Sequence, residues 1–376
     1  MEAAGRAGLD FVALTDHNTL AARSQEGWWG RTLLIVGQEV SPEKEHYLAF
    51  GLDHVVRPVL GEADRYMAEV AAGGGFGFVA HPFDRGNPRV GVPGYEWRPL
   101  LSWAEGPENA PPDGPFAGLE VWNYYSEWLG SERTVPQAVR ALVMPRVFGP
   151  GPPALGLALW DALGRQRRVA GIGGLDAHGT DEGFPWGRLR VMGYDFAFAT
   201  LRTNVLLERP LSTPAGEGGR EGGNGPAGDG PRHDRIAAQA DDIQAILEAL
   251  RGGRALLVDA SQGPAKGARF RAVPADVGGS TRSALPGDEI LPGGEVLPGS
   301  PLLARGSVVE FQFAVPAPAR LVILRDGKPL ARGYGRFLTV VARGPGVYRA
   351  EAHRWRGRWR PWILANPIYV RGGDSR

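Results

Sequence analysis

The stretch GLDFVALTDHNT, residues 8–19, contains a short apolar segment, FVAL, that ends directly before Thr15, Asp16 and His17. In α/β barrels the functional groups lie at the carboxyl ends of the strands, so Asp16 and His17 stand where such groups are expected. Taken alone, a Thr-Asp-His tripeptide is more often a turn that caps a helix. Its interpretation therefore depends on whether later strands carry similar residues at their ends.

Short apolar segments and helical stretches alternate through about the first two hundred residues. This alternation predicts an α/β barrel or a wound sheet. The expected strands are Phe11–Leu14, Leu33–Val36, Tyr47–Phe50, Phe76–Ala80, Leu119–Val121 and Val169–Ile172. The expected helices include Ala63–Ala72, Pro153–Gly164 and, further along the chain, Asp241–Gly252.

Histidines and carboxylates recur at or near the ends of these strands. The candidates are Asp16, His17, Glu39, His46, His81, Glu120, Asp176 and His178. Their nitrogens and oxygens are suited to zinc, manganese or iron, and the chain has no cysteine that could offer a thiolate. A metal ion at one barrel mouth would make water a usable nucleophile. For single residues other interpretations stay open: Asp16 could orient the His17 ring, His46 could face solvent, and Glu120 could contact substrate.

Six motifs follow one another in the order expected of a known superfamily. They are GLDFVALTDHNT (8–19), VGQEVS (36–41), EHYLAFG (45–51), VAHP (79–82), GLEVWN (118–123) and GGLDAHG (173–179). Over residues 1–260 the chain resembles the polymerase and histidinol phosphatase (PHP) superfamily of metal-dependent hydrolases. The helical stretch ILEALRGGRALL (246–257), the β-rich region after it and the ending ILANPIYV (363–370) make it most similar to the carbaryl hydrolase-like branch.

The resemblance implies a distorted (β/α)7 barrel that binds two or three zinc, manganese or iron ions. In that reading Asp16 and His17 are catalytic, Glu39 bridges the ions, and the metal ligands are His17, Glu39, His46, His81, Glu120, Asp176 and His178. The superfamily implies hydrolysis of nucleotide or oligonucleotide phosphate esters by metal-activated water. The nearest branch implies a carboxylic or carbamate ester instead, and a third reading is a catalytically impaired barrel that acts as a binding protein.

The superfamily's first motif, a strand that ends in His-x-His, has no counterpart in this chain. The seven histidines stand at 17, 46, 54, 81, 178, 233 and 353, and no two of them are separated by a single residue. Either the start codon is misassigned and about 20–40 further residues precede Met1, or the gene is truncated and the barrel lacks its first strand. We favour the first interpretation, because the other ligands are all present.

The remainder of the chain predicts a connection and a second, β-rich domain. Within the barrel domain of residues 1–260, the Gly-rich segment 211–235 is expected to be a flexible insertion. Residues 261–306 form a Gly/Pro-rich connection. Residues 307–376 alternate apolar and polar side chains, which predicts a small antiparallel β-sandwich with a hairpin turn at Asp326–Gly327.

The run HRWRGRWRPW, residues 353–362, has two interpretations. It could be a nucleic-acid stripe, in which arginines contact phosphates and tryptophans stack on bases. It could also be an amphipathic strand pair with the tryptophans inward and the arginines outward. We favour the second interpretation.

Overall composition limits the partners. The net charge of +1 gives no global attraction to nucleic acid or to a membrane surface. The sequence has no apolar run of about 18 residues or more and no visible signal peptide. We expect a small-molecule or nucleotide-type ester as substrate, nucleic acid only as substrate, no membrane partner and a cytoplasmic location. The sequence does not indicate an oligomeric state.

Overall fold

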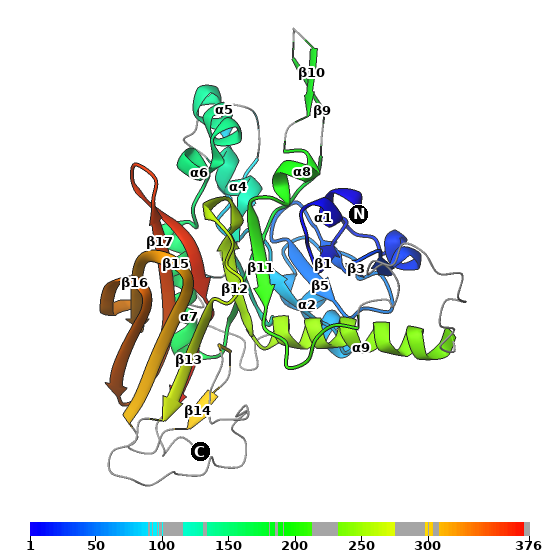
Figure 1. The fold of residues 1–376 in the computed structure, drawn as a ribbon. Coiled ribbons are helices and arrows are strands. Elements are labelled where there is room, and N and C mark those ends of the chain that lie inside the picture. Colours follow the sequence, from blue (N-terminus) through cyan, green and yellow to red (C-terminus); the bar gives the residue numbers. More distant parts are fainter. Residues whose placement is uncertain are drawn as a thin grey trace, which may run out of the picture.

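The chain folds into a mixed α/β structure in which two N-terminal sheets lie beside a large C-terminal sheet (Figure 1). The structure is a computed structural model. It describes residues 1–371 except for 89–90, 92, 96, 98–99, 101–115, 131–133, 180, 185–186, 191, 213–231, 275–297, 300 and 304–307.

The first sheet carries the strand of the opening motif. Its order is β1-β3-β2, with β1 parallel to β3 and β2 antiparallel to it. All of β3 is buried, whereas the residues of β1 are half-buried or exposed. In the described part of the chain, β1 pairs with β3 and with no other strand. The elements of this region are α1 (Glu2–Arg6), β1 (Phe11–Leu14), η1 (Ala21–Gln25), β2 (Gly27–Trp29) and β3 (Thr32–Val36).

The second sheet has five strands in the order β4-β5-β6-β7-β8. Strand β5 pairs antiparallel with both β4 and β6. Strands β6, β7 and β8 are parallel. The strands are β4 (Gln38–Val40), β5 (Tyr47–Phe50), β6 (Phe76–Val79), β7 (Gly118–Asn123) and β8 (Ala170–Gly174). The helices between them are α2 (Ala63–Ala72), α4 (Tyr124–Leu129), α5 (Val135–Val143), α6 (Pro145–Phe148) and α7 (Ala154–Gln166).

A nine-stranded sheet contains most of the C-terminal region. Its main path is β11-β12-β18-β17-β15-β13, with β16 on β15 and β19 joining β14 to β17. The strands are β11 (Leu201–Val205), β12 (Ala255–Asp259), β13 (Arg269–Pro274), β14 (Pro301–Leu303), β15 (Val308–Arg325), β16 (Lys328–Arg343), β17 (Gly346–Trp355), β18 (Trp359–Ala365) and β19 (Ile368–Arg371). The remaining elements are β9 (Asp181–Phe184), β10 (Gly187–Arg190), α8 (Tyr194–Ala197), α9 (Arg232–Arg251) and η4 (Ala260–Gln262).

The predicted strands and helices agree closely with the observed ones. Phe11–Leu14, Tyr47–Phe50 and Ala63–Ala72 are found with the predicted bounds, and the other predicted strands shift by one or two residues at an end. Helix α9 begins nine residues before the predicted Asp241, and its apolar face packs in a cluster that includes residues of β3 and β6. None of the helices among the described residues is long and apolar enough to cross a membrane.

The predicted closed barrel is not shown by the strand pairing of the described residues. The chain leaves the first sheet after β3, turns at Gly37 and enters the second sheet as β4, and an isolated parallel bridge between His17 and Glu39 links the two sheets. The observed class is therefore mixed α/β and rich in sheet. The (β/α)7 arrangement stays a prediction.

The domain boundaries also stay a prediction. Strand β12 lies inside the predicted barrel domain, yet it pairs with β18, so a hydrogen-bonded ladder crosses the proposed limit at residue 260. In the described residues the C-terminal strands belong to one hydrogen-bonded sheet. The predicted sandwich of two sheets therefore stays a prediction. Most of the Gly-rich insertion and much of the 261–306 connection fall on residues 213–231, 275–297 and 304–307, outside the described residues.

The C-terminal sheet confirms the predicted hairpin but corrects the Arg/Trp run. Asp326 and Gly327, both at positive φ, form the turn between β15 and β16. Trp362 is buried as expected, whereas Trp355 and Trp359 are exposed and Arg360 is buried. Trp355 points away from the core by the alternation of β17 itself, in which Ala350 and Ala352 face inward. In β18 a register shift leaves Trp362 as an extra residue, which reverses the faces of Trp359 and Arg360.

A buried amide joins the second sheet to the C-terminal sheet. The side chain of Asn366 accepts a hydrogen bond from Gly171 N (2.6 Å) and donates to Gly171 O (2.8 Å) and Ala255 O (3.0 Å). We expect Asn366→Ala to lower the free energy of unfolding by about 2 kcal/mol, since buried backbone groups lose their partners. Urea denaturation would measure this loss, and a change below about 0.5 kcal/mol would contradict the assigned role.

Candidate metal centre

The opening motif is held against strand β4 by backbone and side-chain hydrogen bonds. Asn18 N donates to Glu39 O (2.9 Å), and Glu39 N donates to Asp16 O (3.1 Å). The Asn18 side chain accepts from Ser41 N (2.8 Å) and donates to Ser41 O (3.0 Å). Asn18 is at φ 53, a conformation that asparagine tolerates better than most residues. These contacts place the His17 side chain next to Glu39.

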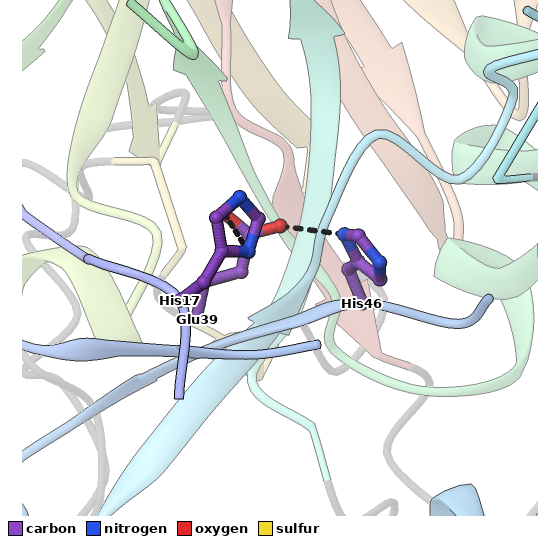
Figure 2. A group of neighbouring side chains, drawn as sticks. All are labelled: His17, Glu39 and His46. Carbon is purple, nitrogen blue, oxygen red and sulfur yellow. Dashed lines mark hydrogen bonds and ion pairs between the residues drawn. The ribbon is translucent and has the colours of Figure 1, made fainter. Parts of the chain in front are cut away.

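Glu39 is the centre of a histidine cluster (Figure 2). Its carboxylate is buried, with Oε1 2.8 Å from His46 Nδ1 and 3.2 Å from His81 Nε2. Glu39 Oε2 lies 4.0 Å from His17 Nδ1. One ligand atom from each of His17, Glu39 and His46 lies within 4.8 Å of the others. Three histidines from separate segments therefore meet at one carboxylate.

A second group of side chains reaches the same place from β7 and the end of β8. His81 N donates to Glu120 Oε2 (2.6 Å), and Asn123 Nδ2 donates to Glu120 Oε2 (3.0 Å) and to Asp176 Oδ2 (3.4 Å). His178 is partly exposed, with its ring 5.8 Å from that of His17. A Cβ at Gly174 would come within 1.8 Å of Glu120 Oε1, so a larger residue there would displace the Glu120 carboxylate.

The pKa shifts in the cluster arise from burial and from hydrogen bonds and charges within the cluster. Burial alone would raise the pKa of Glu39, but hydrogen bonds with His46 and His81 outweigh it and hold that pKa well below its usual range. Burial opposes protonation of His81, yet its bond to Glu39 and the nearby carboxylates raise its pKa to about 9. Burial raises the pKa of Glu120 to about 7 and also raises the pKa of Asp176. A cation among these buried carboxyls would favour their charged forms.

The donor set fits a divalent metal ion. His46 Nε2 lies 2.9 Å from the carbonyl oxygen of Pro42, which requires a proton on Nε2 and leaves Nδ1 free to act as a ligand in the neutral ring. Nδ1 and Glu39 Oε1 face each other at 2.8 Å, a hydrogen-bond distance, and a metal ion bound to both atoms would replace the shared proton. The His81 Nδ1 atom is buried and has no hydrogen-bond partner in the described part of the chain. Imidazole and carboxylate are ligands of zinc, manganese and iron.

The structure thus brings the predicted residues together, although it does not test their roles. His17, Glu39, His46 and His81 form direct contacts, and Glu120, Asp176 and His178 lie beside them. The predicted contact between Asp16 and the His17 ring is replaced by Ser41, whose Oγ lies 2.5 Å from His17 Nδ1. The catalytic role of Asp16, which is exposed, stays a prediction.

Three residues near the cluster were not predicted from the sequence. Ser41 and Asn123 end the motifs VGQEVS and GLEVWN, and Ser41 directly follows β4 whereas Asn123 is the last residue of β7, so their position at a strand end was a usable signal. Tyr95, whose ring lies 4.7 Å from that of His46 and 5.6 Å from that of His81, belongs to an irregular segment and had no such signal.

A cavity of about 1110 Å³ opens beside the cluster. At one end it is lined by the acidic and imidazole side chains His17, Glu39, His81, Glu120, Asp176 and His178. Apolar side chains line much of the rest, including Leu34, Phe50, Phe78 and Ile172, and Arg202 and Lys266 lie on its wall. The cluster is therefore open to a space large enough for a small organic substrate.

Comparison with known proteins adds little to this geometry. No protein-family model matches the chain, and no curated protein matches it. A solved structure from Bacteroides vulgatus, a two-domain protein containing a predicted PHP-like metal-dependent phosphoesterase, is similar with a TM-score of 0.34 and 16% sequence identity. The match covers 96% of this chain and 88% of that chain. A likeness this loose does not define the chemistry of the chain.

Proposed function

We propose that this chain is a divalent-metal-dependent hydrolase of ester bonds, of the PHP type. The observation that carries the proposal is the meeting of His17, Glu39 and His46 in one group whose ligand atoms lie within 4.8 Å of one another. Glu39 and His46 are buried and His17 is exposed beside them, and the buried charged groups need compensation that a metal ion would supply. When bound, a divalent ion supplies water that is acidic enough to attack an ester near neutral pH.

Each residue of the cluster then has a definite task. Glu39 supplies the shared carboxylate, and His17, His46 and His81 supply imidazole nitrogens around it. The Pro42 carbonyl keeps the His46 ring oriented. Asn123 links the Glu120 and Asp176 carboxylates by donating to both. His178 is exposed next to the cavity, where it can contact the substrate.

We favour a phosphate ester of a nucleotide or oligonucleotide as the substrate. The motif resemblance supports it, and Arg202 and Lys266 add positive charge to the cavity wall. A phosphate group would be attracted both by these cations and by a metal ion. Two or three ions of zinc, manganese or iron would suit the number of ligands.

A carboxylic or carbamate ester is the second candidate. The observation that favours it is the apolar cavity wall formed by Leu34, Phe50, Phe78 and Ile172, which suits an aryl or alkyl group better than a charged nucleotide. Under this alternative the same residues bind the metal, and the apolar part of the substrate packs against this wall.

Metal content and thermal stability test the metal part of the proposal. The full chain, first stripped with a chelator, is expected to bind Zn²⁺ or Mn²⁺ and to gain about 2.7 kcal/mol of stability at a free ion concentration 100 times the Kd. Elemental analysis and thermal unfolding would measure this. A protein that binds no divalent ion and shows no shift in Tm would contradict the proposal and favour a binding protein without catalysis.

An activity screen tests the substrate. The metal-loaded chain would be assayed with p-nitrophenyl phosphate, bis-p-nitrophenyl phosphate, p-nitrophenyl acetate and 1-naphthyl N-methylcarbamate. Turnover confined to the phosphate esters supports the first candidate, and turnover confined to the other two supports the second. Metal binding without turnover of any of them counts against both.

A further inference from the structure

One face of the C-terminal sheet is covered at one end and open at the other. Directly paired residues of neighbouring strands share a face, so Arg320 on β15 lies in one row with Tyr334 on β16 and His353 on β17. Further along β15 on the same face, Val322 and Leu324 are buried, and Arg349, paired with Leu324, contacts Asp161 of α7. In the row of Arg320 the side chain of Tyr334 is exposed, whereas Arg320 and His353 are half-buried.

Three aromatic rings gather on the open end of this face. Trp355 pairs directly with Trp359 across the β17–β18 hairpin, and Trp355 stands two residues beyond His353. The ring of Trp359 lies 5.3 Å from Trp355 and 6.5 Å from Tyr334, in edge-to-face arrangements. Tyr334, Trp355 and Trp359 are nevertheless 73%, 57% and 36% exposed. A cluster of large aromatic side chains left in water is typical of an interaction site.

The surroundings of these rings are positively charged. The Arg320 guanidinium lies 5.2 Å from the centre of the Trp359 ring. Arg336 and Arg358 are exposed beside Tyr334 and Trp359 in the sequence, and neither forms an ion pair with a described residue. Neither segment 328–343 nor segment 352–371 contains an aspartate or glutamate. Glu351, two residues before His353 on the same face, is already paired with Arg349 and His353. The aromatic end of the face is therefore cationic, although the whole chain carries a net charge of only +1.

We propose that this aromatic–arginine surface, formed by Arg320, Tyr334, Arg336, Trp355, Arg358 and Trp359, binds single-stranded nucleic acid. Exposed rings offer stacking faces to unpaired bases, and arginines between them can contact phosphates. A double helix would keep its bases stacked and away from these rings, which favours a single strand. A neutral polysaccharide would also stack on tryptophan but would not account for the unpaired arginines. The surface lies on the C-terminal sheet, away from β1 and β3 (Figure 1), and its binding does not depend on the proposed hydrolase activity.

Fluorescence anisotropy with the full chain tests this proposal. The probe is a fluorescein-labelled thymidine oligonucleotide of about 12 nucleotides, used in the presence of EDTA so that hydrolysis cannot intervene. We expect the double variant Trp355→Ala/Trp359→Ala to weaken binding at least about tenfold, because stacking on two bases is lost. Arg336→Gln/Arg358→Gln is expected to weaken binding and to make it less dependent on salt between about 50 and 200 mM.

Matched variants separate this surface from general effects. Trp29→Ala removes an exposed tryptophan from the first sheet and should leave the Kd unchanged. Trp359→Phe should retain most of the affinity, since it keeps an aromatic ring. Equal affinity of the wild type and a correctly folded Trp355→Ala/Trp359→Ala variant would overturn the proposal. Tighter binding of cellohexaose than of the oligonucleotide, lost in the same variant, would overturn it in favour of a polysaccharide.

Discussion

Glu39→Gln is expected to lower hydrolase activity at least about 100-fold and to abolish tight binding of divalent ions. The Glu39 carboxylate contacts His46 at 2.8 Å and His81 at 3.2 Å, so it is a group that the other proposed ligands share. Glutamine preserves its size but offers one neutral oxygen in place of two charged ones. Metal content and turnover of the substrate found in the activity screen would be measured together.

A matched control removes a carboxylate elsewhere. Glu69→Gln changes a partly exposed carboxylate on α2, whose nearest ion-pair partner is His54 at 3.6 Å, and should leave metal content and activity within about twofold of the wild type. If Glu39→Gln retained its metal and its turnover while folding normally, Glu39 would not be the shared ligand and the metal centre would lie elsewhere.

Asp161→Asn is expected to lower the free energy of unfolding by about 3 kcal/mol. Asp161 lies on α7, and its two carboxylate oxygens are 2.6 and 2.8 Å from the Arg349 guanidinium on β17. Arg349 is also bonded to Glu351 and is almost completely buried. Replacing one carboxylate by a neutral amide leaves a buried cation with less compensation, which costs far more than breaking a pair in water. Urea denaturation followed by circular dichroism would measure the loss.

The corresponding surface pair supplies the comparison. Glu62 and Arg65 lie 3.1 Å apart at the start of α2 and are both exposed. Glu62→Gln should therefore change stability by less than about 0.5 kcal/mol. Similar losses for Asp161→Asn and Glu62→Gln would show that the buried pair does not join α7 to the sheet as its geometry indicates.

The strands near the metal centre were predictable because their signal is local. Phe11–Leu14 and Tyr47–Phe50 are short apolar runs bounded by polar or glycine residues, and this length and these boundaries favour a strand over a helix. The position of His17, His46 and His81 next to strands followed from the same reading. Tyr95 could not be found in this way, since it reaches the cluster from an irregular segment without periodicity.

The pairing of strands that lie far apart in the sequence was harder to predict. The sequence placed Ala255–Asp259 in the barrel domain, whereas this strand pairs with β18 more than one hundred residues later. Strand propensity predicts that a segment is extended but does not predict which strand it pairs with, because many apolar strands can satisfy the same backbone hydrogen bonds. That choice depends on packing over the whole chain.

The sequence alone determined which residues carry imidazole and carboxylate groups and that most of these residues adjoin strands. Only the tertiary structure decided that His17, Glu39 and His46 meet within 4.8 Å, and that Trp355 and Trp359 face water whereas Arg360 is buried. The physical reason is the same in both cases. Side-chain identity is a property of one position, but the direction in which a strand residue points depends on register, and a single bulge reverses it.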